Sequence, residues 1–289
     1  MTYKYKQKIY LVKPMKWLLA IALTLSSTTQ YSTQVIAQTK QTPTTKQGVQ
    51  PVKTPASPQK RTSRPVFVLP KAPARLSPIS GRRAGMGSRD NCPAVATALT
   101  ALVPLQEEKK VSKHTDKSVI GIVQGLTTSE RPTFWFYVPY THDLASSIAE
   151  FSLQDHGGED VYRNAIALPP QPGIIAVSLP ENVSLEVGQT YRWYFKIRCR
   201  QQTTSVPVYV EGDIQRINLD SRVTQELAAA TNPQQKIFIY AKEGIWFNAL
   251  TLLAQLRRAN YRDPSVEADW QSLLQSAGLD HIATSPLLN

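Results

Sequence analysis

Hydrophobic and polar residues alternate most regularly in residues 190–200. One side of this stretch is apolar and carries Tyr191, Trp193, Phe195, Ile197 and Cys199. The other side is basic and carries Arg192, Lys196, Arg198 and Arg200. A period of two with aromatic and β-branched residues predicts a strand with one buried face.

The same alternation, interrupted by turns, recurs through the middle of the chain. The predicted strands are residues 118–124, 133–139, 147–154, 160–167, 173–179, 190–200 and 206–217. Short strands at this spacing are typical of an all-β sandwich. The pattern Leu185-x-x-Gly188-x-x-Tyr191 also looks like the tyrosine corner of immunoglobulin-like sandwiches. We therefore expect an immunoglobulin-like antiparallel β-sandwich over residues 84–218.

Acidic residues on the last predicted strand have a clear counterpart on the strand before it. Glu211 and Asp213 fall on the side opposite Val208 and Ile214. We expect these acids to pair with the basic row across the two strands. The alternative is a basic stripe, including Arg192 and Arg198, that binds a ligand.

After Asn218 the apolar spacing becomes helical, and residues 219–289 predict a C-terminal helical segment. Asp220 or Ser221 can cap the first helix, and Asp263-Pro264 is a cap followed by proline at the first helical position. Between them, Tyr240-x3-Gly244-x-Trp246-x2-Ala249-x3-Leu253 matches the signature of a tetratricopeptide-like helix pair. By propensity alone, residues 236–241 fit either a helix or a strand.

One such helix pair is too little for a solenoid, which needs about three repeats. We therefore expect the pair to pack on the sandwich as a structural cap. A peptide-binding groove is the alternative.

Residues 1–37 have the parts of a secretory signal peptide: lysines, then the short apolar run 17–25, then a small residue at the cleavage site. Cleavage is expected between Ala37 and Gln38, which predicts a protein of the periplasm or the cell exterior. An uncleaved anchor is the alternative, but the run has about half of the roughly 20 residues that span a bilayer. Membrane contact is expected only through this segment before cleavage.

Residues 38–83 are rich in Thr, Gln, Pro, Lys and Ser, which predicts a disordered basic linker. They hold ten Lys or Arg and no acid, and residues 1–37 hold five Lys and no acid. Residues 84–289 hold 18 basic and 21 acidic residues, so the formal charge of +12 resides in the signal and the linker. This distribution argues against a nucleic-acid partner.

Cys92 and Cys199 are the two cysteines of the chain. In an exported protein an even number of cysteines predicts one disulfide. Closing a loop of about 100 residues stabilises the fold by about 4–5 kcal/mol in the chain-entropy model. Two free thiols are the alternative.

An ordered series of motifs then carries a family resemblance. It includes Gly85-x-Gly87-x-Arg89-x2-Cys92, Pro132-Thr133-Phe134-Trp135, Gly212-x-Ile214-x-Arg216, Tyr240-Ala241-x2-Gly244-Ile245-Trp246 and Trp270-x2-Leu273-Leu274. The series resembles the cyanobacterial domain-of-unknown-function family DUF928 over roughly residues 82–285. The resemblance implies an exported cyanobacterial protein and carries over no activity, cofactor or catalytic residue.

Candidate chemistry is sparse. None of the four histidines pairs with another at i, i+4, and the acidic turn 155–160 is too short for an EF-hand. We therefore assign no catalytic, cofactor-binding or metal-ligating residue. Trp135 and Tyr137 share one face of a predicted strand, which is either buried core or, if exposed, a surface for stacking sugars or a partner.

These observations predict an exported, non-enzymatic binding or scaffolding module of the cell envelope, whose partner is an envelope protein. The alternative is a polysaccharide- or peptidoglycan-binding protein that uses Trp135, Tyr137 and the basic stripe. A hydrolase is a weaker alternative, because a triad can be recognised only by its geometry.

Overall fold

The computed structural model describes residues 63–70, 81–85, 92–109, 119–143, 148–199 and 207–288. All of them belong to the second of two compact units, Pro58–Asn289. The expected signal peptide, with Ala37 and Gln38, and most of the expected linker lie outside the described residues.

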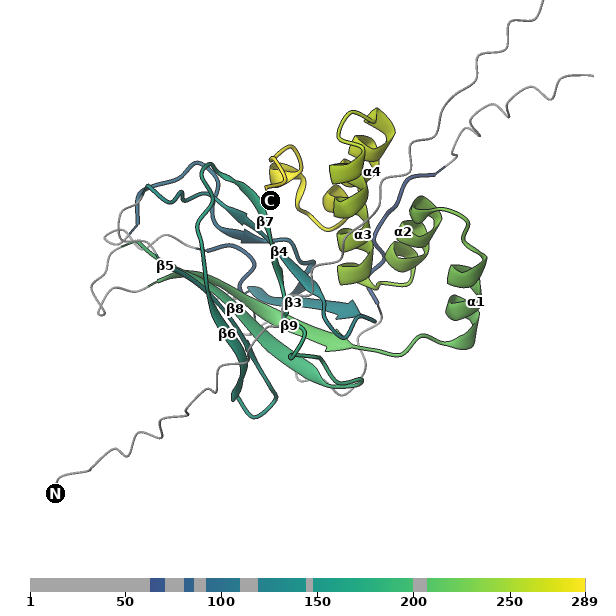
Figure 1. Cartoon of the computed structure of the whole chain (residues 1–289), viewed down its shortest axis with the longest axis horizontal. Coiled ribbons are helices and arrows are strands. Elements are labelled where there is room, and N and C mark those ends of the chain that lie inside the picture. The colour runs from purple at the N-terminus through teal and green to yellow at the C-terminus, as the bar shows by residue number, and fades with distance from the viewer. Residues whose placement is uncertain are drawn as a thin grey trace, which may run out of the picture. The chain divides into compact units, whose positions relative to one another are not determined.

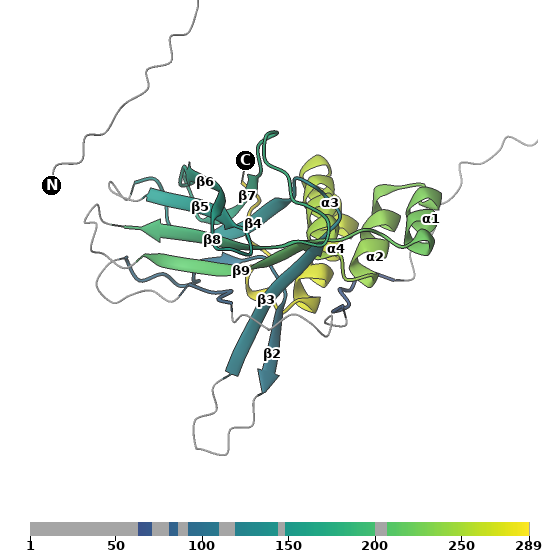
Figure 2. The ribbon, with the colours of Figure 1, turned by 90° about the horizontal axis from the view of Figure 1, so that it is seen from below.

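The described residues form a mainly β protein with helices at its C-terminal end (Figure 1). One sheet has the order β1-β4-β7 and comprises Thr100–Ala101, Thr133–Val138 and Gly173–Ser178. The other has the order β2-β3-β9-β8-β5-β6 and comprises Leu105–Lys109, Val119–Thr127, Val208–Arg216, Thr190–Arg198, Ile148–Gln154 and Asp160–Ile166. All seven predicted strands are present, and β1 and β2 are additional. The hairpin of β2 and β3 projects away from the rest of the described fold (Figure 2).

The expectation of a purely antiparallel arrangement is wrong at one position. β3 runs parallel to β9, with Gln124 opposite Asp213 and Thr127 opposite Arg216. β8 occupies the other edge of β9 in antiparallel register. Strand alternation reveals which residues share a face, but this pairing joins strands about 90 residues apart and has no local signal.

The two sheets pack face to face through aromatic side chains. Phe136 of β4 stacks on Phe195 of β8 with ring centroids 4.4 Å apart, and Phe134 lies 4.8 Å from Phe151 of β5. At the corner before β8, the Tyr191 hydroxyl accepts a hydrogen bond from the backbone N–H of Glu186 at 3.0 Å. This hydrogen bond ties the start of β8 to the backbone five residues upstream.

The helices are α1 (Ser221–Ala229), α2 (Pro233–Lys242), α3 (Trp246–Ala259), α4 (Pro264–Ser276) and the short 3-10 helix η1 (Asp280–Ile282). Asp220 caps α1, with its carboxylate accepting from the Val223 N–H at 2.7 Å. Asn232 and Asp263 cap α2 and α4, each of which begins with proline. Residues 236–241 are therefore helical.

Helix α3 packs against β4 and β3: the Phe247 ring lies 5.4 Å from Phe134 of β4, and a Cβ at Gly125 of β3 would lie 2.7 Å from the Phe247 ring. The Trp246 indole donates to the carbonyl oxygen of Leu102 at 2.7 Å, and the Trp135 indole donates to the Thr251 hydroxyl at 3.1 Å. One hydrophobic core therefore continues from the sheets into the helices. In the described part of the chain, no helix is long and apolar enough to cross a membrane.

Two stretches that overlap the expected linker, residues 63–70 and 81–85, contact the rest of the described fold. In residues 81–85, Arg82 pairs with Glu211 of β9, and Ala84 pairs with Thr100 of β1. The Arg83 guanidinium donates to the carbonyl oxygens of Ala277 and Gly278 at the end of α4, at 2.7 and 3.0 Å. Arg82 therefore joins this stretch to the six-stranded sheet through its main chain, and Arg83 joins it to the end of α4 through its side chain. Residues 63–70 form the second stretch and lie against the helices.

Candidate functional site: a groove in the helical layer

Residues 63–70 run as an extended segment between α2 and α4 (Figure 1). Pro65 and Phe67 are buried, with Phe67 only 6% exposed, whereas Val66 and Val68 are 54% and 51% exposed. This alternation is that of a strand with one face against a surface. We call the surface beneath it the groove; its contacting residues are Ala241, Gly244, Trp246, Ser272 and Ser276.

The groove holds the main chain of the segment through three hydrogen bonds. The Ser272 hydroxyl donates to the carbonyl oxygen of Pro65 at 3.0 Å. The Phe67 N–H donates to the Ser276 hydroxyl oxygen at 2.9 Å, and the Val68 N–H donates to the carbonyl oxygen of Ala241 at 3.0 Å. Both α2 and α4 therefore recognise backbone atoms of an extended chain.

One aromatic side chain anchors the segment. The Phe67 ring meets the Trp246 ring edge to face, with centroids 4.9 Å apart. Trp246 begins α3 and is fully buried. An edge-to-face pair of this kind contributes beyond its buried area.

Gly244 brings the chain reversal after α2 close to the segment. Its φ is +73°, a conformation that favours glycine, and the turn lets α3 begin at Trp246. A Cβ at this position would lie 2.9 Å from both the Val68 carbonyl oxygen and the Pro70 Cδ. The position therefore requires glycine both for the turn and for the approach of the segment.

A hollow lies beside the first described residues of the segment. A hollow of about 640 Å³ lies between Ser63 and Pro65 on one side and α1 and α2 on the other. Ala229, Gln235 and Phe238 are among its lining residues, and Phe238 is 40% exposed. This end of the groove therefore has room for a side chain or a longer extended segment.

The two residues of the candidate stacking surface, Trp135 and Tyr137, differ in burial. Trp135 is 2% exposed, because Thr251 meets its indole N–H and the Arg258 guanidinium lies 5.1 Å above its ring. Tyr137 is half-buried against the core. A stacking surface requires exposure, so Trp135 is a core residue and does not form such a surface together with Tyr137.

One member of the predicted basic row of β8, Arg192, meets the acids of β9. Arg192 lies 2.9 Å from Glu211 and 3.4 Å from Asp213, and its Nε donates to the Tyr194 hydroxyl. Burial raises the pKa of Asp213 to about 6; the Arg192 guanidinium opposes that rise, and the Glu211 carboxylate adds to it. Arg192 is thus part of an internal ion cluster, whereas Arg198 is exposed at the end of β8.

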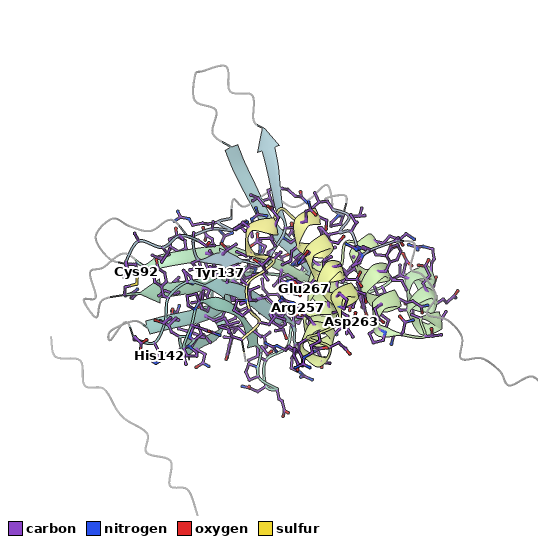
Figure 3. The ribbon with its side chains drawn as sticks, turned by 90° about the horizontal axis from the view of Figure 1, so that it is seen from above. Cys92, Tyr137, His142, Arg257, Asp263 and Glu267 are labelled. Atoms are coloured by element: carbon purple, nitrogen blue, oxygen red, sulfur yellow. A yellow bond between two sulfur atoms is a disulfide. The ribbon has the colours of Figure 1, made fainter. Side chains whose placement is uncertain are left out.

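The predicted disulfide joins Cys92 to Cys199. It ties the chain before β1 to the residue after β8. Figure 3 shows Cys92 and His142 at the end of the sheets remote from the helices. The disulfide and the groove are therefore at separate ends of the described fold.

No group of three or more His, Cys, Asp or Glu side chains that could hold a metal ion occurs among the described residues. In the acidic turn, the Asp155 carboxylate accepts from the N–H groups of Gly157 and Glu159, at 2.8 and 3.0 Å. Asp155 therefore closes a hairpin turn.

A second hollow, of about 330 Å³, lies at the opposite end of α3 and α4 from the groove. Arg257, Arg258, Tyr261, Glu267 and Leu287 line it. Arg257 donates to Glu267 at 2.7 Å, and Tyr261 is 74% exposed. Figure 3 shows Arg257 and Glu267 on the helices.

A family model described as Domain of Unknown Function (DUF928) matches residues 84–287. The chain belongs to the DUF928 family. No curated protein matches the chain. A solved structure of a β-glucuronidase from Parabacteroides merdae, with glycerol in its active site, is 11% identical, with a TM-score of 0.22. The match covers 62% of this chain and 27% of that enzyme, and a likeness this low carries no argument about fold or activity.

The groove lies inside the DUF928 region, but the segment that occupies it does not. Every groove residue, from Ala241 to Ser276, lies inside the matched region, whereas the segment 63–70 precedes it. A peptide-binding groove was an alternative for the helix pair, but Ser272 and Ser276 were not predicted, because two serines in a helix carry no special signal. The segment had one: Val66-Phe67-Val68-Leu69 is a run of four apolar residues within an otherwise polar stretch.

Proposed function

We propose that this DUF928 protein is an exported, non-enzymatic binding module of the cell envelope, and that its groove holds an extended polypeptide segment of an envelope protein. The observation that carries the proposal is the docked segment 63–70, held by three main-chain hydrogen bonds and the Phe67 anchor. Extended peptides that add to a sheet edge are recognised by main-chain hydrogen bonds with pockets for alternate side chains, and the groove offers the same kinds of contact. The groove alternative is therefore preferred over a purely structural cap.

Export is supported by two features. Residues 1–37 have the composition of a signal peptide, and the disulfide between Cys92 and Cys199 suits an oxidising compartment. The periplasm or the outer envelope is accordingly the proposed location.

The finer fold assignment is part of the same proposal. The hydrogen bond from Glu186 to the Tyr191 hydroxyl supports an immunoglobulin-like sandwich. The turn at Gly244 between α2 and α3 supports a tetratricopeptide-like helix pair. On this assignment the sandwich is a rigid base and the helix pair presents the binding surface.

A crosslinked pull-down from the native envelope fraction tests the function, with the tagged mature protein as bait. Phe67→Ala removes the anchor of the docked segment, and Val66→Ala, at an exposed neighbour, is the matched control. On this proposal the docked segment occupies the surface that the partner binds, so its release frees that surface. We therefore expect one envelope protein to be recovered several-fold more efficiently with Phe67→Ala than with wild type or Val66→Ala. The proposal would be contradicted if recovery of envelope proteins were the same with Phe67→Ala as with wild type. It would also be contradicted if only wall polymer were recovered.

Polysaccharide binding is a second candidate, favoured by the hollow beside Tyr261. An exposed aromatic ring next to Arg258 suits an acidic sugar, which offers a face for stacking and a carboxylate. We expect Tyr261→Ala to reduce retention in affinity electrophoresis with polygalacturonate, and Phe238→Ala, an exposed aromatic on α2, to leave it unchanged. Equal retention of both variants would assign any binding to the basic linker.

A further inference from the structure

The groove recognises features that any extended polypeptide can offer. Its three hydrogen bonds go to a carbonyl oxygen and two N–H groups of the main chain. Side-chain selection comes from only two positions, Pro65 and Phe67, which are two residues apart and point into the helices. In peptide recognition of this kind, main-chain bonds supply affinity and alternate side chains supply specificity.

The occupant has the character of an added ligand. It lies outside the DUF928 region that contains the whole groove. Ten residues, 71–80, separate it from the stretch 81–85 that joins the sheets. Two of its three hydrogen bonds to the groove, those to Ser272 and Ser276, span more than 200 positions in the chain.

Exposed apolar side chains and a hollow lie around the occupant. Its own Val66, Val68 and Leu69 are each about half exposed, at 54%, 51% and 49%. A hollow of about 640 Å³ lies beside Ser63 and Pro65, and Phe238 on its lining is 40% exposed. Exposed apolar surface concentrated at one place marks an interaction site.

We propose that the groove binds an extended segment of a second polypeptide with the pattern Pro-x-Phe, and that residues 63–70 compete with it as an intramolecular ligand. The proline carbonyl accepts from Ser272, the phenylalanine N–H donates to Ser276, and the phenylalanine ring meets Trp246. The residue after phenylalanine donates its N–H to the Ala241 carbonyl, so it is not proline. This inference rests on the proposed function and names the chemistry of the partner.

Competition follows from the covalent connection. A segment tethered by a short linker has an effective concentration in the millimolar range at its site. A free segment of equal intrinsic affinity therefore binds the wild-type protein poorly and binds well once the tethered segment has been released. The protein is regulated by whatever removes residues 63–70 from the groove.

The test uses the full mature chain and a fluorescein-labelled synthetic peptide with the sequence of Arg64–Pro70. Val68→Pro releases the tethered segment, because proline lacks the N–H that bonds to Ala241. Val66→Pro is the matched control, since no hydrogen bond from the Val66 N–H occurs among the described residues. Fluorescence anisotropy measures binding, and a second peptide carries alanine in place of its phenylalanine.

We expect Val68→Pro to bind the peptide at least tenfold more tightly than wild type or Val66→Pro. The alanine peptide should bind Val68→Pro at least tenfold more weakly. A folded Val68→Pro protein that binds neither peptide, or both equally, would overturn the inference. Phe67→Ala repeats the comparison if Val68→Pro does not fold; unfolding of both variants would instead make the segment an indispensable part of the fold and also overturn it.

The two proposals fail separately. Peptide binding to Val68→Pro without any Phe67-sensitive envelope partner would retain the groove's ligand class and reject the envelope function. A Phe67-sensitive partner that does not compete with the peptide would retain the function and reject Pro-x-Phe as the recognised pattern.

Discussion

The outer face of the six-stranded sheet and the groove of the helical layer satisfy their polar groups in different ways. On the sheet, Arg192 meets Glu211 and Asp213, which lie on the adjacent strand β9. In the groove, Ser272 and Ser276 meet main-chain atoms of a segment more than 200 positions away. The charges of Arg192, Glu211 and Asp213 are therefore paired within one sheet, whereas the two serines bond to a segment that is distant in the sequence.

Replacing Arg192, the cation of the ion cluster, should lower the free energy of unfolding substantially. Arg192→Met leaves Glu211 and Asp213 without their shared partner in a site where Asp213 is 7% exposed. Breaking a buried ion pair from one side costs about 3–5 kcal/mol in the free energy of unfolding. Urea unfolding of the mature protein measures the loss.

Arg163→Met is the control for that measurement. Arg163 pairs with Glu150 and Asp160, but its side chain is 44% exposed, so its loss should cost less than about 1 kcal/mol. Equal destabilisation by the two variants would mean that the cluster around Arg192 is solvated like an ordinary surface, and the contrast with the groove would disappear.

The pH dependence of stability sharpens the same contrast. The pKa of Asp213 is raised from its ordinary value of 3.8 to about 6 in the folded protein, so the folded state binds its proton more tightly than the unfolded state. The resulting stabilisation is present below about pH 4 and is lost as the pH rises to about 6. The contribution is at most roughly 3 kcal/mol, from about 1.4 kcal/mol per pKa unit.

Asp213→Asn should remove this part of the pH dependence, and Asp143→Asn, at a side chain 77% exposed, should leave it unchanged. Thermal unfolding of both variants and wild type between pH 4 and 7 checks the prediction. A wild-type profile that rises with pH over this interval and is the same in Asp213→Asn would contradict it.

Local pattern was sufficient to predict most of the secondary structure. Alternation located the seven principal strands, and the caps at Asp220 and Asp263 located two helix starts, because each depends on neighbouring residues. β2 was missed because Leu-Gln-Glu-Glu-Lys lacks β-branched residues. β2 is a strand because it pairs with β3, although its sequence has no strand signal.

The features that could not be predicted depend on contacts between residues far apart in the sequence. Nothing near Trp135 indicates that Arg258 and Thr251 will cover it, so its face could not be assigned as core from the strand alone. The stretch 63–70 has a composition near that of a linker, and only its four apolar residues predict burial. The groove becomes recognisable when α2, α3 and α4 have brought Ala241, Trp246 and Ser276 to one place.

The smallest expected effect is the most informative about the groove. Truncating a phenylalanine in a closed core costs about 3–5 kcal/mol. Phe67→Ala should cost about 2 kcal/mol or less, because the segment can leave the groove and the loss cannot exceed its docking free energy. Hydrogen exchange should then show faster exchange at the Phe67 and Val68 N–H groups, with β8 and β9 unchanged and Val66→Ala as the control. A loss as large as that of Phe195→Ala in the sheet core, with exchange accelerated throughout, would mean that the segment and the sheets unfold as one unit and that the groove does not open independently.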